Sequence, residues 1–158
     1  MIRLAPILVS LLAFAAASCG GGDDGGDAPS RQEFAERADE VCRQAVRSLE
    51  KVAQDADTPQ DIADAVDRVI EESRDSIDQL SDLERPEGEA GKAAREFVEA
   101  TRSELEDEAI PALEQLGDAI ESRDQQGVRE AAARLENLDT GESDRAAREI
   151  GADECAEG

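Results

Sequence analysis

The sequence predicts an all-α protein, a mostly antiparallel four-helix bundle that follows a disordered N-terminal signal and linker. Three observations predict this fold. Apolar residues recur at intervals of three and four positions after residue 30, which is the spacing of one helix face. Helix-start residues and helix-breaking prolines or glycines divide these stretches into separate helices. Removal of residues 1–18 from the 158-residue chain leaves 140, enough for one modest core. A short fifth helix near the C-terminus fits the same pattern.

Residues 1–18 are predicted to be an export signal. Arg3 supplies a positive charge, and residues 4–18 contain no charged side chain, which is typical of the apolar region of a signal peptide. A transmembrane helix needs about 20 apolar residues, so this segment is short for a membrane span.

Three small residues, Ala16, Ala17 and Ser18, come directly before Cys19. This order resembles the lipobox of bacterial lipoproteins, in which the cysteine receives a diacylglyceryl group before cleavage. The resemblance implies lipid attachment at Cys19. The alternative is ordinary secretion with cleavage near Ala17, which leaves Cys19 as a free thiol.

Residues 19–29 are predicted to be the lipidated cysteine and a linker, and residues 30–158 an acidic helical domain. After Cys19 the linker contains only Gly, Asp, Ala and Pro, so it has nothing large to bury. We expect a flexible, self-repelling tether.

The first helix is predicted to begin at Ser30. Ser30 and Glu33 have the spacing of a capping box, in which each side chain accepts a hydrogen bond from the backbone N–H of the other residue. Asp39 and Arg43 are spaced for a favourable ion pair on the outer face. The core face consists of Phe34, Ala38, Val41, Ala45, Leu49 and Val52.

The second helix is predicted to start at Thr58 as N-cap, with Pro59 at the first helical position. The Arg-Pro-Glu-Gly sequence at residues 85–88 ends it. Its core face consists of Ile62, Val66, Val69, Ile70, Ile77, Leu80 and Leu83.

The third helix is predicted to be the longest, from about residue 89 to 121, with Pro111 in its interior. Proline has no backbone N–H and clashes with the carbonyl four residues before it, so we expect a kink or a break. One interpretation is a cleft opened beside Glu104, Asp107 and Glu108. The interpretation that we favour is a bend that wraps a long helix around the bundle. The core face consists of Phe97, Val98, Thr101, Leu105, Ala109, Ala112, Leu113, Leu116 and Ile120.

Two short helices are predicted to follow, at residues 124–138 and 142–150, and together they can span one long neighbour. Gly151 is placed like the residue after a helix end. The apolar residues of the first short helix are Val128, Ala131, Ala132, Leu135 and Leu138.

The cysteine count agrees with export to an oxidising compartment. If Cys19 carries lipid, Cys42 and Cys155 remain, and an even number of cysteines in an exported protein predicts a disulfide. A closed loop of about a hundred residues stabilises a fold by roughly 4 to 5 kcal/mol in the chain-entropy model. The alternative is two buried free thiols.

Several stretches of the chain resemble a group of small helical lipoproteins of high-GC Gram-positive bacteria. After the lipobox and linker these are Ala-Asp-Glu-Val-Cys (38–42), Leu-Ser-Asp-Leu-Glu-Arg-Pro (80–86) and Ala-Arg-Glu-Ile-Gly-Ala-Asp-Glu-Cys (147–155). Members of the group share a first-helix cysteine, a leucine-proline junction and a terminal Gly-x-x-x-Cys. The resemblance covers most of the mature chain and implies the bundle and the disulfide, but no activity.

Missing residue types exclude several kinds of chemistry. The chain has no histidine, which excludes Ser-His-Asp and Cys-His catalysis and histidine-based zinc or iron sites. It has no tyrosine or tryptophan, and Phe34 and Phe97 lie on core faces, which argues against sugar-stacking surfaces. The net charge of −23 becomes −24 when Arg3 leaves with the signal. Such a charge repels nucleic acid and anionic lipid headgroups.

We therefore expect a lipid-anchored protein on the extracytoplasmic face of the cell membrane, attached through acyl chains on Cys19. The expected function is a non-catalytic binding or interaction module of the cell envelope. Its expected partner is an envelope protein or a small ligand, without nucleic acid, cofactor or metal. One alternative is low-affinity binding or buffering of divalent cations by acidic helix faces. The third is a carboxylate-dependent hydrolase that uses Glu104, Asp107 and Glu108.

Overall fold

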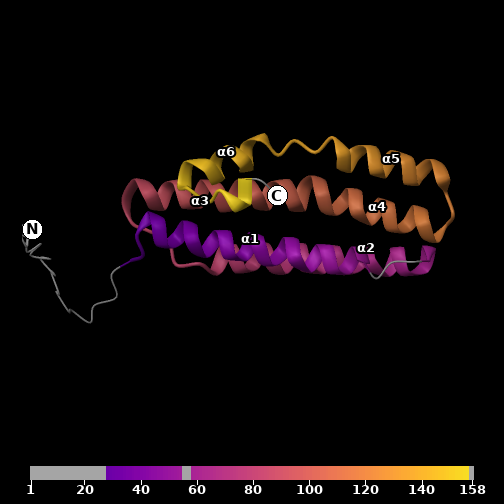
Figure 1. Cartoon of the computed structure of the whole chain (residues 1–158). Helices are drawn as coiled ribbons and strands as arrows, with labels where there is room; N and C mark the ends of the chain where they lie inside the picture. The colour runs from indigo at the N-terminus through magenta and orange to yellow at the C-terminus, as the bar shows by residue number, and fades with distance from the viewer. Residues whose placement is uncertain (1–27, 55–57, 157–158) are drawn as a thin grey trace, which may run out of the picture.

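The computed structural model describes residues 28–54 and 58–156. The predicted signal, Cys19 and residues 19–27 of the linker lie outside these ranges. The described residues form helices that run side by side in an elongated bundle (Figure 1), and no strand occurs among them. None of these helices is long and apolar enough to cross a membrane. The predicted all-α helical bundle is confirmed.

Helix α1 (Arg31–Gln54) begins at the predicted capping box. The backbone N–H of Ser30 donates to Glu33 Oε2 at 2.8 Å, and the backbone N–H of Glu33 donates to Ser30 Oγ at 3.2 Å. Phe34 and Ala38 are fully buried on the predicted core face. Two orphan amide groups at the helix start are thereby satisfied, and the helix enters the core within its first turn.

The predicted ion pair between Asp39 and Arg43 is wrong. Arg43 contacts Glu40 at 2.5 Å and Glu154 at 3.6 Å. Asp39 accepts a hydrogen bond from the backbone N–H of Glu154 at 3.0 Å. The C-terminal segment, which is far away in sequence, therefore competes successfully for both side chains.

Helix α2 (Pro59–Asp82) runs back along α1, and a second capping box closes its first turn (Figure 1). The backbone N–H of Thr58 donates to Asp61 Oδ2 at 2.9 Å, and the backbone N–H of Asp61 donates to Thr58 Oγ1 at 3.2 Å. Proline is tolerated at the helix start because an N–H there has no intrahelical partner. Ile77 and Leu80 are buried near the other end of the helix. The predicted start of this helix is confirmed.

The chain turns tightly between α2 and α3 (Gly88–Ser103), at the predicted Arg-Pro-Glu-Gly sequence. Gly91 lies directly against this turn, because a Cβ atom at residue 91 would lie 2.0 Å from the carbonyl oxygen of Pro86. Any larger residue at position 91 would force the turn away from α3. The glycine therefore fixes the close approach of α3 to the turn.

Helix α3 continues through the π-helical turn η1 (Glu104–Ala109) into α4 (Ile110–Glu121). The predicted disturbance at Pro111 takes this form, and the helical path is not broken. The backbone N–H of Ile110 donates to the carbonyl of Leu105, five residues back. A π-helical turn is wider than an α-helical turn, which gives the proline ring room beside the preceding carbonyl groups.

Helices α5 (Gln125–Glu136) and α6 (Gly141–Ile150) share the fourth position of the bundle. Helix α5 packs against α4 and helix α6 packs against α3 (Figure 1). The prediction that two short helices span one long neighbour is thus confirmed. Gly151 follows α6 with a φ of 91°, the left-handed conformation expected after a helix end.

The C-terminal segment is joined to α1 by the predicted disulfide between Cys42 and Cys155. The two sulfur atoms are 2.06 Å apart and the two Cα atoms 5.3 Å apart. The short 3-10 helix η2 (Glu154–Ala156) packs against both α1 and α6. The tail therefore ties the first helix to the last one.

Two clusters of buried apolar side chains fill the bundle. The larger surrounds the first half of α1 and the second half of α2, and includes Phe34, Ile77, Leu80, Phe97 and Ile150. The smaller consists of Val66, Ile70 and Ile110, with Leu113, Leu116 and Ile120 only partly buried against it. The half of the bundle that contains the start of α2 and the end of α4 is therefore less completely packed.

Candidate functional site

The predicted cleft near Pro111 is only partly assembled. Glu104 and Glu108 border a hollow of about 290 Å³ beside α6, but Asp107 and Pro111 do not line it. Asp107 is exposed and accepts a hydrogen bond from Ser103 Oγ at 2.8 Å. We call this space the acidic hollow. It is lined by Glu96, Glu99, Ala100, Ser103, Glu104, Glu108, Asp139, Glu142 and Ser143.

Glu104 is the most constrained carboxylate of the acidic hollow. The hydroxyl of Ser143 donates to Glu104 Oε2, and the same hydroxyl lies 2.9 Å from the carbonyl of Thr140. Burial raises the pKa of Glu104, the hydrogen bond from Ser143 lowers it, and the charges of Asp144 and Glu108 raise it further. The contact of Ser143 with Glu104 could not be predicted from the sequence, because the two residues are 39 positions apart and lie on different helices.

The acidic hollow is not arranged as a metal site. Within residues 28–54 and 58–156, no group of three or more His, Cys, Asp or Glu side chains could hold a metal ion. Hard cations such as Ca²⁺ need six to eight oxygen ligands at short, fixed distances. Six carboxylates line the hollow and concentrate negative charge there, without forming such a set of ligands.

A larger hollow, of about 890 Å³, lies at the end of the bundle where α2 begins, α4 ends and α5 begins. We call this end the distal end and the space the distal hollow. Helix α4 packs against both α2 and α5, whereas α2 and α5 share no extensive contact, so a gap remains between them above α4. Its lining is Thr58, Gln60, Ile62, Ala63, Ala119, Ile120, Glu121, Arg123, Gln125, Val128 and Arg129.

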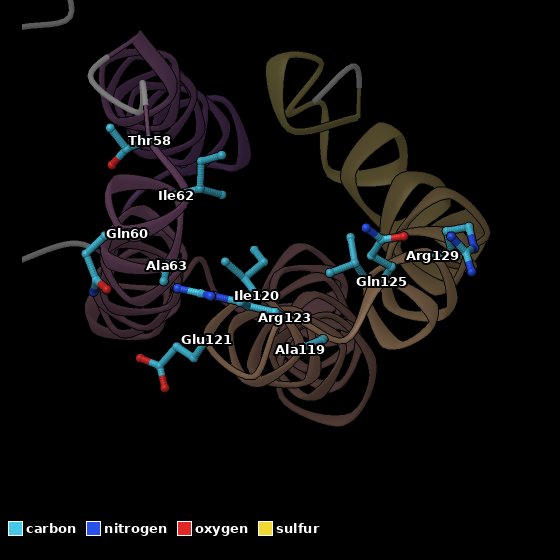
Figure 2. A pocket seen from close by; sticks show the side chains of 11 residues that line it. Thr58, Gln60, Ile62, Ala63, Ala119, Ile120, Glu121, Arg123, Gln125 and Arg129 are labelled. Carbon is cyan, nitrogen blue, oxygen red and sulfur yellow. The ribbon is translucent and has the colours of Figure 1, made fainter.

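Apolar side chains form the inner surface of the distal hollow. Figure 2 shows Ile62 from α2 and Ile120 from α4 directed into the space between α2 and α5. The prediction placed Ile62 on the core face, but this side chain is 40% exposed. Ile120 and Val128 are only half-buried. The reason is that α5 stays on the far side of α4 and does not cover the first turn of α2.

Arg123 lies at the rim of the distal hollow, just after the end of α4. Its φ of 57° is the left-handed conformation that glycine usually supplies at this place. The backbone N–H of Arg123 donates to the carbonyl of Ile120, and that of Asp124 donates to the carbonyl of Ala119. In Figure 2 the Arg123 side chain extends toward Ala63 on α2. Sequence patterns give no signal for such a residue, because they do not reveal a positive φ.

The distal hollow differs in charge from four other hollows on the described surface. Two arginines and one glutamate line it, whereas six carboxylates and no cation line the acidic hollow. The remaining three hollows also have more acidic than basic lining residues. In a chain of net charge −23, the largest of these five hollows therefore has the least acidic lining.

Comparisons with known proteins do not assign the chain to a family. No protein-family model matches the sequence, and neither curated proteins nor solved structures gave a match. The geometry described above is therefore the basis of the functional proposal.

Proposed function

We propose that this protein is a lipid-anchored, extracytoplasmic binding module of the cell envelope without catalytic activity. The observation that carries the proposal is the position of the distal hollow. It opens at the end of the bundle opposite to the start of α1, which follows the linker (Figure 1). Helix α1 runs along the bundle and has 24 residues, so at 1.5 Å per residue its first and last residues are about 36 Å apart. A ligand in the hollow would be held away from the anchor.

Membrane attachment in this proposal depends on acyl chains at Cys19. The lipobox-like sequence and the resemblance to small helical lipoproteins of high-GC Gram-positive bacteria support it. A mature charge of −24 does not favour binding to anionic headgroups, so a lipid anchor is the attachment that fits the chain best. Acyl mass on Cys19 of the mature protein, measured by mass spectrometry, is the direct test, with Cys19→Ser as control.

The binding function is tested by cross-linking in intact cells. A photoreactive amino acid replaces Ile62 in the distal hollow, and in a matched variant it replaces Gln79, an exposed residue of the same helix. We expect a molecule, either a protein or a small ligand, to be captured from position 62 and not from position 79. Equal capture at the two positions, or none above background with abundant protein, would contradict the proposal.

A second candidate is low-affinity binding of divalent cations in the acidic hollow by its negative charge alone, without a fixed set of ligands. Six carboxylates face one space of about 290 Å³, and a counter-ion there would reduce their mutual repulsion. A titration with Ca²⁺ or Mg²⁺ at fixed ionic strength tests it, because preferential binding to the folded state raises the melting temperature. An unchanged melting temperature removes this candidate.

A further inference from the structure

We infer that the distal hollow binds a small amphipathic molecule with an apolar body and one carboxylate head, the body against Ile62 and Ile120 and the head at Arg123. This inference rests on the proposed function, because it names the ligand class of the same site.

The shape and surface of the hollow suit a small molecule. Its volume of about 890 Å³ lies in the range of 300 to 1,000 Å³ that is typical of ligand sites. Ile62 is one of only two large apolar side chains that are exposed in the described part of the chain. Removing apolar surface from water is favourable, so an apolar body that covers Ile62 would stabilise the complex.

The charges around the hollow favour a single anionic head. In Figure 2 the side chains of Glu121 and Arg129 point away from the space between α2 and α5, so Arg123 is the one charged lining residue whose side chain reaches toward α2. Two acidic residues nearby are engaged as helix caps. Asp61 accepts a hydrogen bond from the backbone N–H of Thr58, and Asp124 accepts one from that of Gln126.

Larger anionic partners and a second copy of the chain fit less well. The Debye length is about 8 Å at physiological ionic strength, so a small ligand responds mainly to the charges that line its site. A polyanion, or another chain of mature charge −24, meets the acidic surface beyond the hollow and is repelled. The local arginine therefore favours a small monoanion over these macromolecules.

The backbone conformation of Arg123 determines where its guanidinium lies. A residue other than glycine is strained in the left-handed region, and the hydrogen bonds from the backbone N–H groups of Arg123 and Asp124 hold Arg123 there. This conformation places the guanidinium across the rim toward α2. A guanidinium can donate two parallel hydrogen bonds to a carboxylate, which gives the head a defined position.

The test uses the mature chain, residues 19–158, with Cys19→Ser so that no detergent is needed. The probes are octanoate, octanol and octylamine, which share one apolar body and differ in the head. Isoleucine methyl groups are followed by NMR. We expect octanoate to shift the signals of Ile62 and Ile120 and not that of Ile150, which is buried near the other end of the bundle.

Two substitutions separate the role of Arg123 in binding from its role in folding. Arg123→Gln is expected to weaken octanoate binding about tenfold or more and to leave octanol binding unchanged, because a charge-assisted hydrogen bond is lost. Arg123→Gly is expected to weaken octanoate binding by the same factor, while its melting temperature stays the same or rises, because glycine adopts a positive φ without strain. The matched control is Arg145→Gln, which removes the same charge from an exposed side chain on α6.

Three results would overturn the inference. These are equal binding of octanol and octanoate, an equal loss of affinity in the Arg145 control, and the absence of shifts at Ile62 and Ile120. The proposed function fails separately, through the cross-linking test. If position 62 captures an envelope protein while octanoate does not bind, the binding module stands and only the ligand class assigned here is wrong.

Discussion

At the scale of single residues, Glu104 shows how burial and neighbouring charges oppose ionisation. Its folded-state pKa is raised above the ordinary value of 4.5, chiefly by burial, and Asp144 and Glu108 add to this. A carboxyl group with a raised folded pKa contributes stability that is fully present below its unfolded pKa. That contribution is lost as the pH rises from about 4.5 through the folded pKa.

Replacement of Glu104 by Gln is therefore expected to stabilise the protein at pH 7, because Gln cannot ionise and can still accept the hydrogen bond of Ser143. The difference in melting temperature between variant and wild type should shrink as the pH falls below about 4.5, where Glu104 is neutral. Melting curves at several pH values measure this. Glu84→Gln, which removes one charge from an exposed side chain, is the control. An equal gain in both variants would mean that net charge alone is responsible.

Substitution of two helical glycines by alanine is expected to change the free energy of unfolding in opposite directions. Gly91→Ala places a Cβ 2.0 Å from the carbonyl oxygen of Pro86 and should destabilise the protein by about 1 to 3 kcal/mol. Gly117→Ala, in the interior of α4, places a Cβ 3.5 Å from a methyl group of Val66 on α2, an ordinary van der Waals contact, and should stabilise the protein by roughly 0.5 to 1 kcal/mol. Urea denaturation gives both free energies of unfolding. Similar values for the two variants would refute the assigned close approach at Gly91.

At the scale of elements, helix starts could be predicted well because their signals are local. Ser30 with Glu33, and Thr58 with Asp61, form capping boxes in which the two residues are three positions apart. Pro111 also predicts correctly that the helix is irregular near this position. Whether the helix kinks, breaks or widens depends on how α4 packs. The distal hollow could not be predicted, because Ile62 belongs to a regular apolar face and only the placement of α5 leaves it exposed.

The capping box at the start of α2 is expected to contribute to the stability of the protein. Thr58→Ala removes the oxygen that accepts the backbone N–H of Asp61, and should lower the free energy of unfolding by about 1 kcal/mol. Thr58→Ser keeps that oxygen and should have little effect. Urea denaturation followed by circular dichroism measures both. A large effect of Thr58→Ser would show that packing of the threonine methyl group, and not capping, stabilises the start of α2.

At the scale of the whole molecule, the two ends of the bundle are stabilised differently. The larger apolar cluster lies toward the start of α1, where Phe34 and Ile150 are almost completely buried, and the disulfide joins the middle of α1 to the C-terminal segment. The distal end has the smaller cluster and the open hollow. This asymmetry places the best-packed part near the start of α1 and the exposed side chain of Ile62 at the opposite end of the bundle.

The disulfide joins residues 113 positions apart, so its loss should affect both the stability and the distribution of local opening. Replacement of Cys42 and Cys155 by Ser is expected to lower the free energy of unfolding by roughly 4 to 5 kcal/mol, because the unfolded chain regains the entropy of a long open loop. Helices α6 and η2 contact α1 near the bridge, so their amide hydrogen exchange should accelerate more than that of α4 and α5. Urea denaturation and hydrogen exchange measured by mass spectrometry test the two parts. A uniform acceleration along the chain would mean that the bridge acts only on the unfolded state and does not hold α6 against α1.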